Sequence, residues 1–174
     1  MKILTGGKRT AFLAFFISHI PITLLIDAQA VFSVYYPEPL RELIRWYCNI
    51  FGDVLMRYPS PSWFQSLVLG EVLLQLPFFV VAIRVIQEHN SCNSNIKDAQ
   101  RYPPWFRNAS LVYGAHVSTT LIPILTTFWT SEEMHRGQVL ATSLIYSPYL
   151  LFPLALLWHA VSDEPIAGYS MKED

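Results

Sequence analysis

The chain has 174 residues, of which 52% are apolar and only 14% are charged, and its mean hydropathy is +0.31. Soluble domains carry about 25% charged residues, so this composition predicts a membrane protein. The net charge of −1 excludes the strongly basic surface with which proteins bind nucleic acids.

Stretches without lysine or arginine predict four transmembrane helices. They cover about residues 11–34, 63–83, 109–130 and 138–160. Each reaches the length of about 20 residues that a helix needs to cross the hydrocarbon core, where the backbone must satisfy its own hydrogen bonds. We therefore expect a single all-α membrane domain over residues 1–174, built as a four-helix bundle.

The first stretch also imitates a cleavable secretory signal. Ala28-Gln29-Ala30 has the small residues of a cleavage site. Asp27 beside the cut and Pro21 within the apolar core argue against cleavage, so we expect this stretch to remain as the first span.

Basic residues predict the orientation of the four spans. Eight lie on the side of the N-terminus, the Glu88–Arg107 loop and the C-terminus, and four lie on the other side. By the positive-inside rule, both termini are expected in the cytosol. The polar Glu88–Arg107 loop, with its Pro103-Pro104 pair, is expected to be a flexible cytosolic connection.

The segment between the first two spans, about residues 37–63, has an amphipathic pattern. Its apolar residues at helical spacing are Leu40, Leu43, Ile44, Tyr47, Phe51, Val54 and Leu55, and Arg41, Glu42 and Arg45 fall opposite them. The pattern predicts one helix, or two divided at Gly52, lying against the bilayer or capping the bundle on the lumenal side. A solvated helix on a lumenal loop is the alternative.

Prolines near the middle of every span favour a cavity inside the bundle. They are Pro21, Pro77, Pro123, Pro148 and Pro153. Each removes a backbone hydrogen bond and bends its helix. Membrane helices tolerate single prolines, but four bent helices in so small a bundle are expected to splay apart and form a central ligand cavity.

Two acidic residues within the spans, Asp27 and Glu71, are the principal site candidates. Inserting an aspartate at mid-span costs roughly 2.5–3.5 kcal/mol, so such residues usually serve a function. Counted from the span ends, both lie about 10–12 Å below the lumenal surface. Two carboxylates in an apolar pocket cannot both ionise cheaply, so we expect them to share a proton and bind a cation.

Other polar residues fall at the same depth. His19 and Thr23 share a helix face with Asp27, and Gln75 follows Glu71 by one turn; Thr119, Thr120, Tyr146 and Tyr149 lie at comparable depth in the last two spans. This convergence predicts a binding site lined by aromatic residues. Interhelical hydrogen bonding is the alternative, and we favour it for the threonines, His116 and His159. The histidines are scattered over different helices, so neither a metal nor a cofactor is expected.

Five sequence blocks resemble the EXPERA-domain family, and in particular its receptor branch. They are SHIPITLLIDAQAV (18–31), WYCNIFGDVLM (46–56), GEVLLQLPFF (70–79), STTLIPILTTF (118–128) and YSPYLLFPL (146–154). They extend over nearly all of the predicted membrane portion, and two of them carry the intramembrane acids.

The resemblance implies a four-helix protein of the endoplasmic reticulum that binds sterols, oxysterols and cationic amphiphilic molecules, and regulates cholesterol homeostasis or trafficking. By motif, Asp27 resembles the carboxylate that pairs with a ligand amine, and Glu71 resembles the acid beside it. Asp53 resembles a second aspartate that is needed for binding because it holds the lumenal segment over the pocket. Gln75, Thr120 and Tyr149 resemble pocket lining, and a homodimer is implied by the family alone.

The chain differs in two places from the family that it resembles. It ends in Met171-Lys172-Glu173-Asp174 where relatives often carry a lysine-rich retrieval tail, and its Glu88–Arg107 loop is longer and more polar. Reticulum residence is therefore an expectation from the family and not from a signal in this sequence.

An enzymatic function is the alternative to a receptor. The family is related to emopamil-binding sterol isomerases, which move a sterol double bond from the 8-ene to the 7-ene position with acidic groups. These isomerases use a further carboxylate in the third span, whereas residues 109–130 contain neither aspartate nor glutamate. Acid–base work would fall to Asp27 and Glu71 alone, so a non-enzymatic receptor is favoured.

Overall fold

The computed structural model describes residues 1–89 and 101–162. Within these residues the chain is helical. The described residues contain one isolated β-bridge and no β-strand. Four helical segments are long and apolar enough to cross a membrane: Gly6–Tyr35, Ser62–Glu88, Pro104–Thr130 and Arg136–Val161. The predicted all-α membrane fold is confirmed, and each span is longer than predicted. Most of the Glu88–Arg107 loop lies outside the described residues.

The spans differ in how regular they are. The first contains α1 (Gly6–Ile22), a π-helical turn (Thr23–Asp27), α2 (Gln29–Phe32) and a 3₁₀ turn (Ser33–Tyr35), and the second contains α4 (Ser62–Gly70), a π-helical turn (Glu71–Gln75) and α5 (Leu76–Glu88). By contrast, α6 (Pro104–Thr130) and α7 (Arg136–Val161) run unbroken past their interior prolines.

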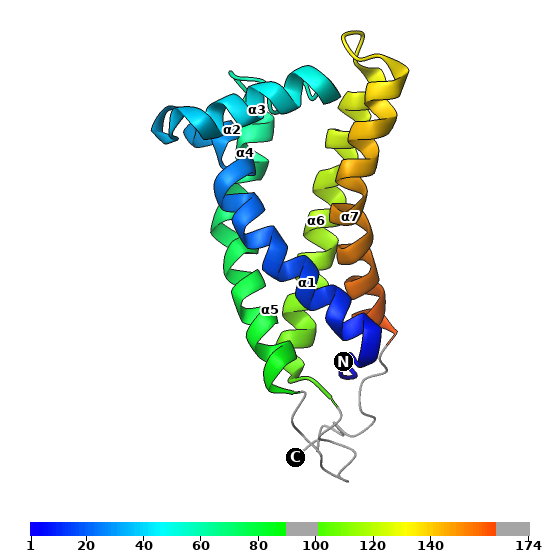
Figure 1. Cartoon of the computed structure of the whole chain (residues 1–174). Helices are drawn as coiled ribbons and strands as arrows, with labels where there is room; N and C mark the ends of the chain where they lie inside the picture. Colours follow the sequence, from blue (N-terminus) through cyan, green and yellow to red (C-terminus); the bar gives the residue numbers. More distant parts are fainter. Residues whose placement is uncertain (90–100, 163–174) are drawn as a thin grey trace, which may run out of the picture.

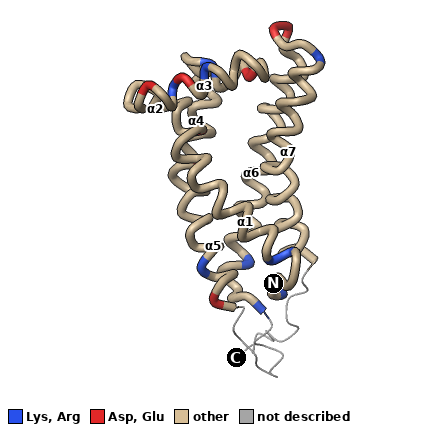
Figure 2. Tube along the Cα trace, in the orientation of Figure 1, with Lys and Arg blue, Asp and Glu red and all other residues tan. Residues whose placement is uncertain are grey.

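The helices form two packed pairs that separate toward one end of the bundle. The most extensive contact joins α6 to α7, which a short turn connects, and α1 packs mainly against α5. The short helix α3 (Glu38–Phe51) lies across the wide end, above the space between the pairs (Figure 1). Charged residues gather at the two ends, while the middle of the bundle is nearly free of them, as a bilayer requires (Figure 2).

Two side chains of α7 hold α3 in this position. Thr142 donates a hydrogen bond to the carbonyl of Phe51 at 2.8 Å, and Gln138 donates one to the carbonyl of Ile50 at 3.2 Å. These are carbonyls that a helix C-terminus leaves without internal partners. Gly52 then ends α3 at a φ of 71°, a left-handed conformation that glycine adopts without strain. The predicted division at Gly52 is thus observed, with a turn and not a second helix after it.

At the opposite end of the bundle, two arginines link neighbouring spans by hydrogen bonds. Arg9 donates from Nε to the carbonyl of Ile86 at 3.3 Å, and Arg107 donates from Nε to the carbonyl of Ala160 at 3.0 Å. Both acceptors belong to the last turns of their helices, where a cation also complements the helix dipole. The first span is thereby tied to the second, and the third to the fourth.

The contact between α6 and α7 depends on the absence of a side chain at Gly114. A Cβ atom there would lie 2.7 Å from Cβ of Leu157 and 2.8 Å from the carbonyl oxygen of Pro153. We expect Gly114→Ala to lower the melting temperature of the detergent-solubilised protein, by an overpacking cost of about 1–3 kcal/mol. Gly70→Ala is the matched control, because a Cβ at Gly70 meets no atom within 4 Å. Equal melting temperatures for the two variants would contradict this account.

Candidate functional site

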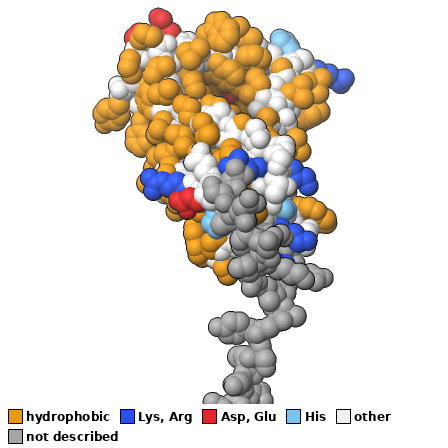
Figure 3. Space-filling model, turned by 60° about the horizontal axis from the view of Figure 1, so that its bottom comes forward, with side chains coloured by type: hydrophobic (Ala, Val, Ile, Leu, Met, Phe, Trp, Pro, Cys, Tyr) orange, Lys and Arg blue, Asp and Glu red, His pale blue; other side chains and the backbone are white. Residues whose placement is uncertain are grey.

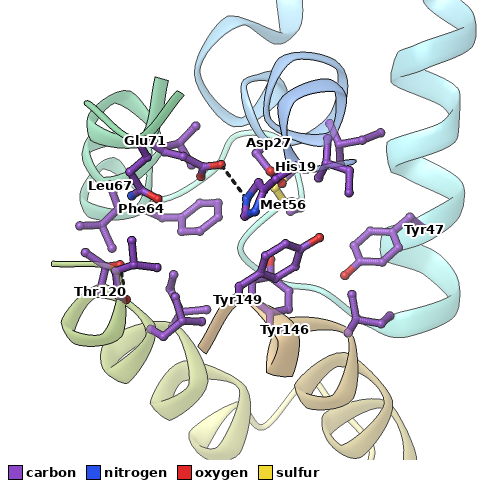
Figure 4. Close-up of a pocket in the computed structure, with 18 residues that line it drawn as sticks. His19, Asp27, Tyr47, Met56, Phe64, Leu67, Glu71, Thr120, Tyr146 and Tyr149 are labelled. Atoms are coloured by element: carbon purple, nitrogen blue, oxygen red, sulfur yellow. Dashed lines mark hydrogen bonds and ion pairs between the residues drawn. The ribbon is translucent and has the colours of Figure 1, made fainter. Parts of the chain in front are cut away.

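A cavity lies between the two helix pairs, beneath α3. It comprises about 820 Å³ of space not filled by atoms, including the part that is open to the surroundings. Its lining comes from all four spans and from the segment between the first two: His19, Ile22, Ile26, Asp27, Tyr47, Met56, Phe64, Leu67, Val68, Glu71, Gln75, Val117, Thr120, Leu121, Ile124, Ile145, Tyr146 and Tyr149. The walls are mostly apolar, with a few polar groups converging from different helices (Figure 4).

The two intramembrane acids meet in this cavity, as their depths predicted. Ligand atoms of His19, Asp27 and Glu71 all lie within 4.8 Å of one another. Both acids lie on π-helical turns, Asp27 at the end of one and Glu71 at the start of the other. Such turns interrupt the α-helical spacing and are frequent at functional sites.

The surroundings of the two carboxyls are unequal. Glu71 accepts a hydrogen bond from the hydroxyl of Thr23 at 2.5 Å, and Nε2 of His19 lies 3.4 Å from the same oxygen. Asp27, in contrast, accepts no side-chain hydrogen bond from any residue that the structure describes, and its carboxylate lines the cavity. Glu71 is therefore held by its own helix pair, whereas Asp27 retains its capacity to bind a ligand.

Aromatic rings enclose the imidazole between the two acids. The ring of His19 lies 4.7 Å from those of Phe79 and Tyr149, and 5.0 Å from that of Phe15, centroid to centroid. This packing buries His19 and fixes the orientation of its ring. Tyr146 and Tyr149 also present ring surface to the cavity, where the face of an aromatic ring attracts a cation.

The fold also assembles a set of groups that could hold a metal ion. One histidine and two carboxylates, from His19, Asp27 and Glu71, are ligand types that divalent cations use. From the sequence, no metal-ligand cluster was expected, because the histidines are scattered over different helices. The structure corrects this expectation of no cluster, since a single histidine lies close to two acids from two spans. An organic ammonium and a metal ion would satisfy the same excess of negative charge.

Asp53 lies behind the cavity wall and is fully buried, with 0% of its surface exposed. One carboxylate oxygen accepts from the backbone amides of Leu55 and Met56 at 2.9 and 3.0 Å, and the other from the hydroxyls of Tyr47 and Tyr146 at 3.1 and 2.9 Å. Burial raises the pKa of Asp53, and these four hydrogen bonds partly offset the shift. Asp53 thus ties the turn after α3 to α7.

Most predicted site residues come together in the structure. Those that line the cavity are His19, Asp27, Glu71, Gln75, Thr120, Tyr146 and Tyr149. The other two do not line it: Thr23 positions Glu71, and Asp53 positions Tyr47 and Tyr146. Thr119, which the sequence placed at the same depth, is exposed and donates to the carbonyl of Ala115 within its own helix.

Some lining residues were not identified from the sequence as site residues. Tyr47 was read as part of the apolar face of an amphipathic helix, yet its hydroxyl is what bonds Asp53. Its hydroxyl, the one polar group on that apolar face, was the available signal. Met56, Phe64 and Leu67 also line the cavity, but nothing in their spacing distinguishes them from apolar residues that face lipid.

Comparison with known proteins identifies clear relatives. The family model described as EXPERA (EXPanded EBP superfamily) matches residues 39–160. Sigma intracellular receptor 2 from Homo sapiens is 38% identical over 157 residues, which cover 82% of this chain and 81% of the relative. The protein of the same name from Xenopus tropicalis is 40% identical over 155 residues, which cover 84% and 83%.

A fungal protein is a more distant relative. Efficient mitochondria targeting-associated protein 19 from Saccharomyces cerevisiae is 31% identical over 157 residues, which cover 83% of this chain and 92% of the relative. The resemblance seen in the sequence blocks is therefore confirmed over most of the chain.

Proposed function

The chain belongs to the EXPERA family of membrane proteins, and from this membership and the geometry of the cavity we propose that it is a receptor of the endoplasmic reticulum membrane that binds sterols, oxysterols and cationic amphiphilic ligands. In this proposal it regulates cholesterol or lipid homeostasis or trafficking and is not an enzyme. Its four spans are oriented with α3 on the lumenal side and both termini in the cytosol.

The observation that carries the proposal is the unequal environment of the acid pair. Asp27 lines an apolar cavity with no hydrogen-bond donor from the described residues, while Thr23 and His19 satisfy Glu71. A charge left unpaired in so apolar a site is costly, and a ligand ammonium relieves that cost. An amphiphile with one amine and an apolar body therefore matches the cavity better than a polar solute.

Apolar lining above and below the acid pair supports the sterol part of the proposal. Val117, Leu121 and Ile124 face the cavity along about two turns of α6, and Ile22 and Ile26 of the first span line it as well. A rigid ring system can bury its faces between these two walls, while Thr120, Gln75 or the carboxyls bind a hydroxyl. In the space-filling view, apolar side chains surround a hollow in the outer surface (Figure 3).

A sterol isomerase is the second candidate, favoured by the same acid pair. His19, Asp27 and Glu71 lie close enough to move a proton onto a bound double bond and off again. A ligand ammonium would then imitate the carbocation formed between the two steps. Against this candidate, the third span supplies no carboxyl to the cavity.

Incubation with an isomerisable sterol separates the two candidates. The purified protein is mixed with an 8-ene sterol, and the bound lipid is extracted and identified by mass spectrometry. We expect bound, unchanged sterol. Recovery of the 7-ene product above the level in an Asp27→Asn and Glu71→Gln double variant would establish the isomerase, and absence of any bound sterol would refute the sterol part of the proposal.

A further inference from the structure

A second cavity lies at the α3 end of the molecule, where the first span ends. Its empty space, including the part open to solvent, is about 1050 Å³. The residues that line it are Gln29, Ser33, Val34, Arg41, Ile44, Arg45, Cys48, Asn49, Met56, Arg57 and Tyr58. Met56 lines both cavities, so its side chain is part of the wall between them.

Three arginines make this cavity unlike the first one. Arg41 and Arg45 reach it from one face of α3, and Arg57 reaches it from the turn that leads to α4; among the described residues that line it, none is acidic. Chain segments on two sides thus bring three guanidinium groups to one concave surface. Guanidinium groups present a planar fork of donors that matches the oxygens of a phosphate.

Neighbouring carboxylates orient these arginines without using all their donors. Glu38 accepts from Nη2 of both Arg41 and Arg45 at 2.5 Å, and Glu133 accepts from Nη1 of Arg57 at 2.8 Å. Each guanidinium offers five N–H donors. Nε of Arg41 is buried without a hydrogen-bond partner, a costly arrangement that an anionic oxygen in the cavity would relieve.

The position of the cavity relative to the spans suggests what kind of anion it takes. Its lining comes from the last turns of the first span, which ends at Tyr35, and from the segment that precedes the second span at Ser62. Apolar and aromatic side chains around it are exposed: 65% for Val34, 83% for Tyr35 and 67% for Tyr58. Exposed aromatic residues at a span end are typical of the headgroup region of a bilayer.

We propose that this arginine-lined cavity binds the phosphate group of an anionic phospholipid from the adjacent leaflet. The acyl chains remain in the bilayer beside the first two spans, and the phosphate takes the donors of Arg41, Arg45 and Arg57 that the carboxylates leave free. Free inorganic phosphate shares this chemistry but lacks the acyl chains that would hold it at the membrane surface. The site is separate from the acid pair and does not depend on what the first cavity binds.

Lipid retention in detergent micelles tests this site. The probe is dioleoylphosphatidic acid, counted by native mass spectrometry, with dioleoylglycerol as the phosphate-free lipid of the same chains. We expect an Arg41→Gln and Arg57→Gln double variant to bind the acidic lipid about tenfold or more weakly. The control is Arg136→Gln, which removes one positive charge, against two in the double variant, from an exposed position at the same end, outside the cavity.

A variant of the accepting carboxylate distinguishes an anion site from a purely structural ion-pair cluster. Glu38→Gln removes the competitor for Arg41 and Arg45, so we expect it to tighten binding of the acidic lipid. Weaker binding in Glu38→Gln, or equal losses in Arg136→Gln and in the double variant, would overturn the proposal. Full displacement of the lipid by millimolar inorganic phosphate would overturn its assignment to a lipid.

Folding of the variants is checked independently of the phosphate site. The double variant should keep the affinity of the wild-type protein for a cationic amphiphile, since none of the arginines that the structure describes lines the first cavity. Should the glutamines prevent folding, an Arg41→Lys and Arg57→Lys double variant keeps both charges. Because lysine lacks the planar fork, we expect an intermediate loss of lipid binding, and unchanged binding would count against recognition of phosphate by the guanidinium groups.

Discussion

Replacing Asp27 with asparagine should reduce the affinity for a cationic amphiphile by about 100-fold or more, because removing one partner of a desolvated charge pair costs several kcal/mol. Asparagine keeps the size of the side chain, removes its charge and replaces one acceptor oxygen by an NH2 donor. In the structure, no described residue donates a hydrogen bond to the Asp27 carboxylate. The substitution therefore acts mainly on the free energy of ligand binding. Equilibrium binding of a tertiary amine to the detergent-solubilised variant measures the effect.

Glu71→Gln is the matched control for this prediction. It also removes one intramembrane carboxyl, but the side-chain carbonyl of glutamine still accepts from Thr23. With Asp27 left as the one acid of the pair, we expect amine affinity to stay within a few-fold of the wild-type value. The opposite ranking, with Glu71→Gln abolishing binding and Asp27→Asn tolerated, would exchange the roles of the two acids. Unchanged affinity in Asp27→Asn would refute the binding mechanism.

Replacing Asp53 is expected to have the largest effect on stability. Asp53→Ala removes all four hydrogen bonds of the carboxylate and leaves two backbone amides and two hydroxyls without their acceptor. Unsatisfied buried polar groups cost about 1–3 kcal/mol each when nothing replaces the partner. We expect a lower melting temperature and weaker amine binding together, because the turn over the cavity and the hydroxyl of Tyr146 lose their anchor.

Asp53→Asn tests whether Asp53 acts through the fold or by contact with the ligand. Its carbonyl can still accept from the amides of Leu55 and Met56, and its amide can donate to the tyrosine hydroxyls. We expect smaller losses of both stability and binding than for Asp53→Ala, in the same ratio. A loss of binding with an unaltered melting temperature would instead show that Asp53 contacts the ligand directly.

The acid pair shows how far sequence alone can go in a membrane protein. Asp27 and Glu71 were identified because an acid within an apolar span is rare, and their meeting was predicted by counting residues from the span ends. Both steps use only composition and the fixed rise of a helix. The structure brings the two together with His19, although both lie on π-helical turns that interrupt regular helical spacing.

Apolar lining residues could not be predicted in the same way. Leu73 and Leu74 are 63% and 64% exposed toward the surroundings, whereas Val68 of the same span is 3% exposed and lines the cavity. In water, apolar residues gather on the inward face of a helix. In lipid both faces are apolar, so the pattern carries no information about which face turns inward.

Hydrogen bonds between polar residues that are distant in sequence could not be predicted from the sequence either. The bond from Thr23 to Glu71 joins two spans, and the four donors to Asp53 come from α3, the turn after it and α7. The three arginines that share the second cavity were read from the sequence only as basic residues on the lumenal side. Their convergence depends on how the turn after Gly52 folds back against α3.

The sequence by itself determined the four membrane spans, the amphipathic segment between the first two of them and the position of two acids within the spans. These follow from local composition, because a bilayer selects any continuous apolar stretch of sufficient length. Only the tertiary structure decided which acid is satisfied by its neighbours and which is left for a ligand, and which side chains enclose each cavity. Those outcomes depend on the rotation and separation of packed helices, which contacts between distant residues set.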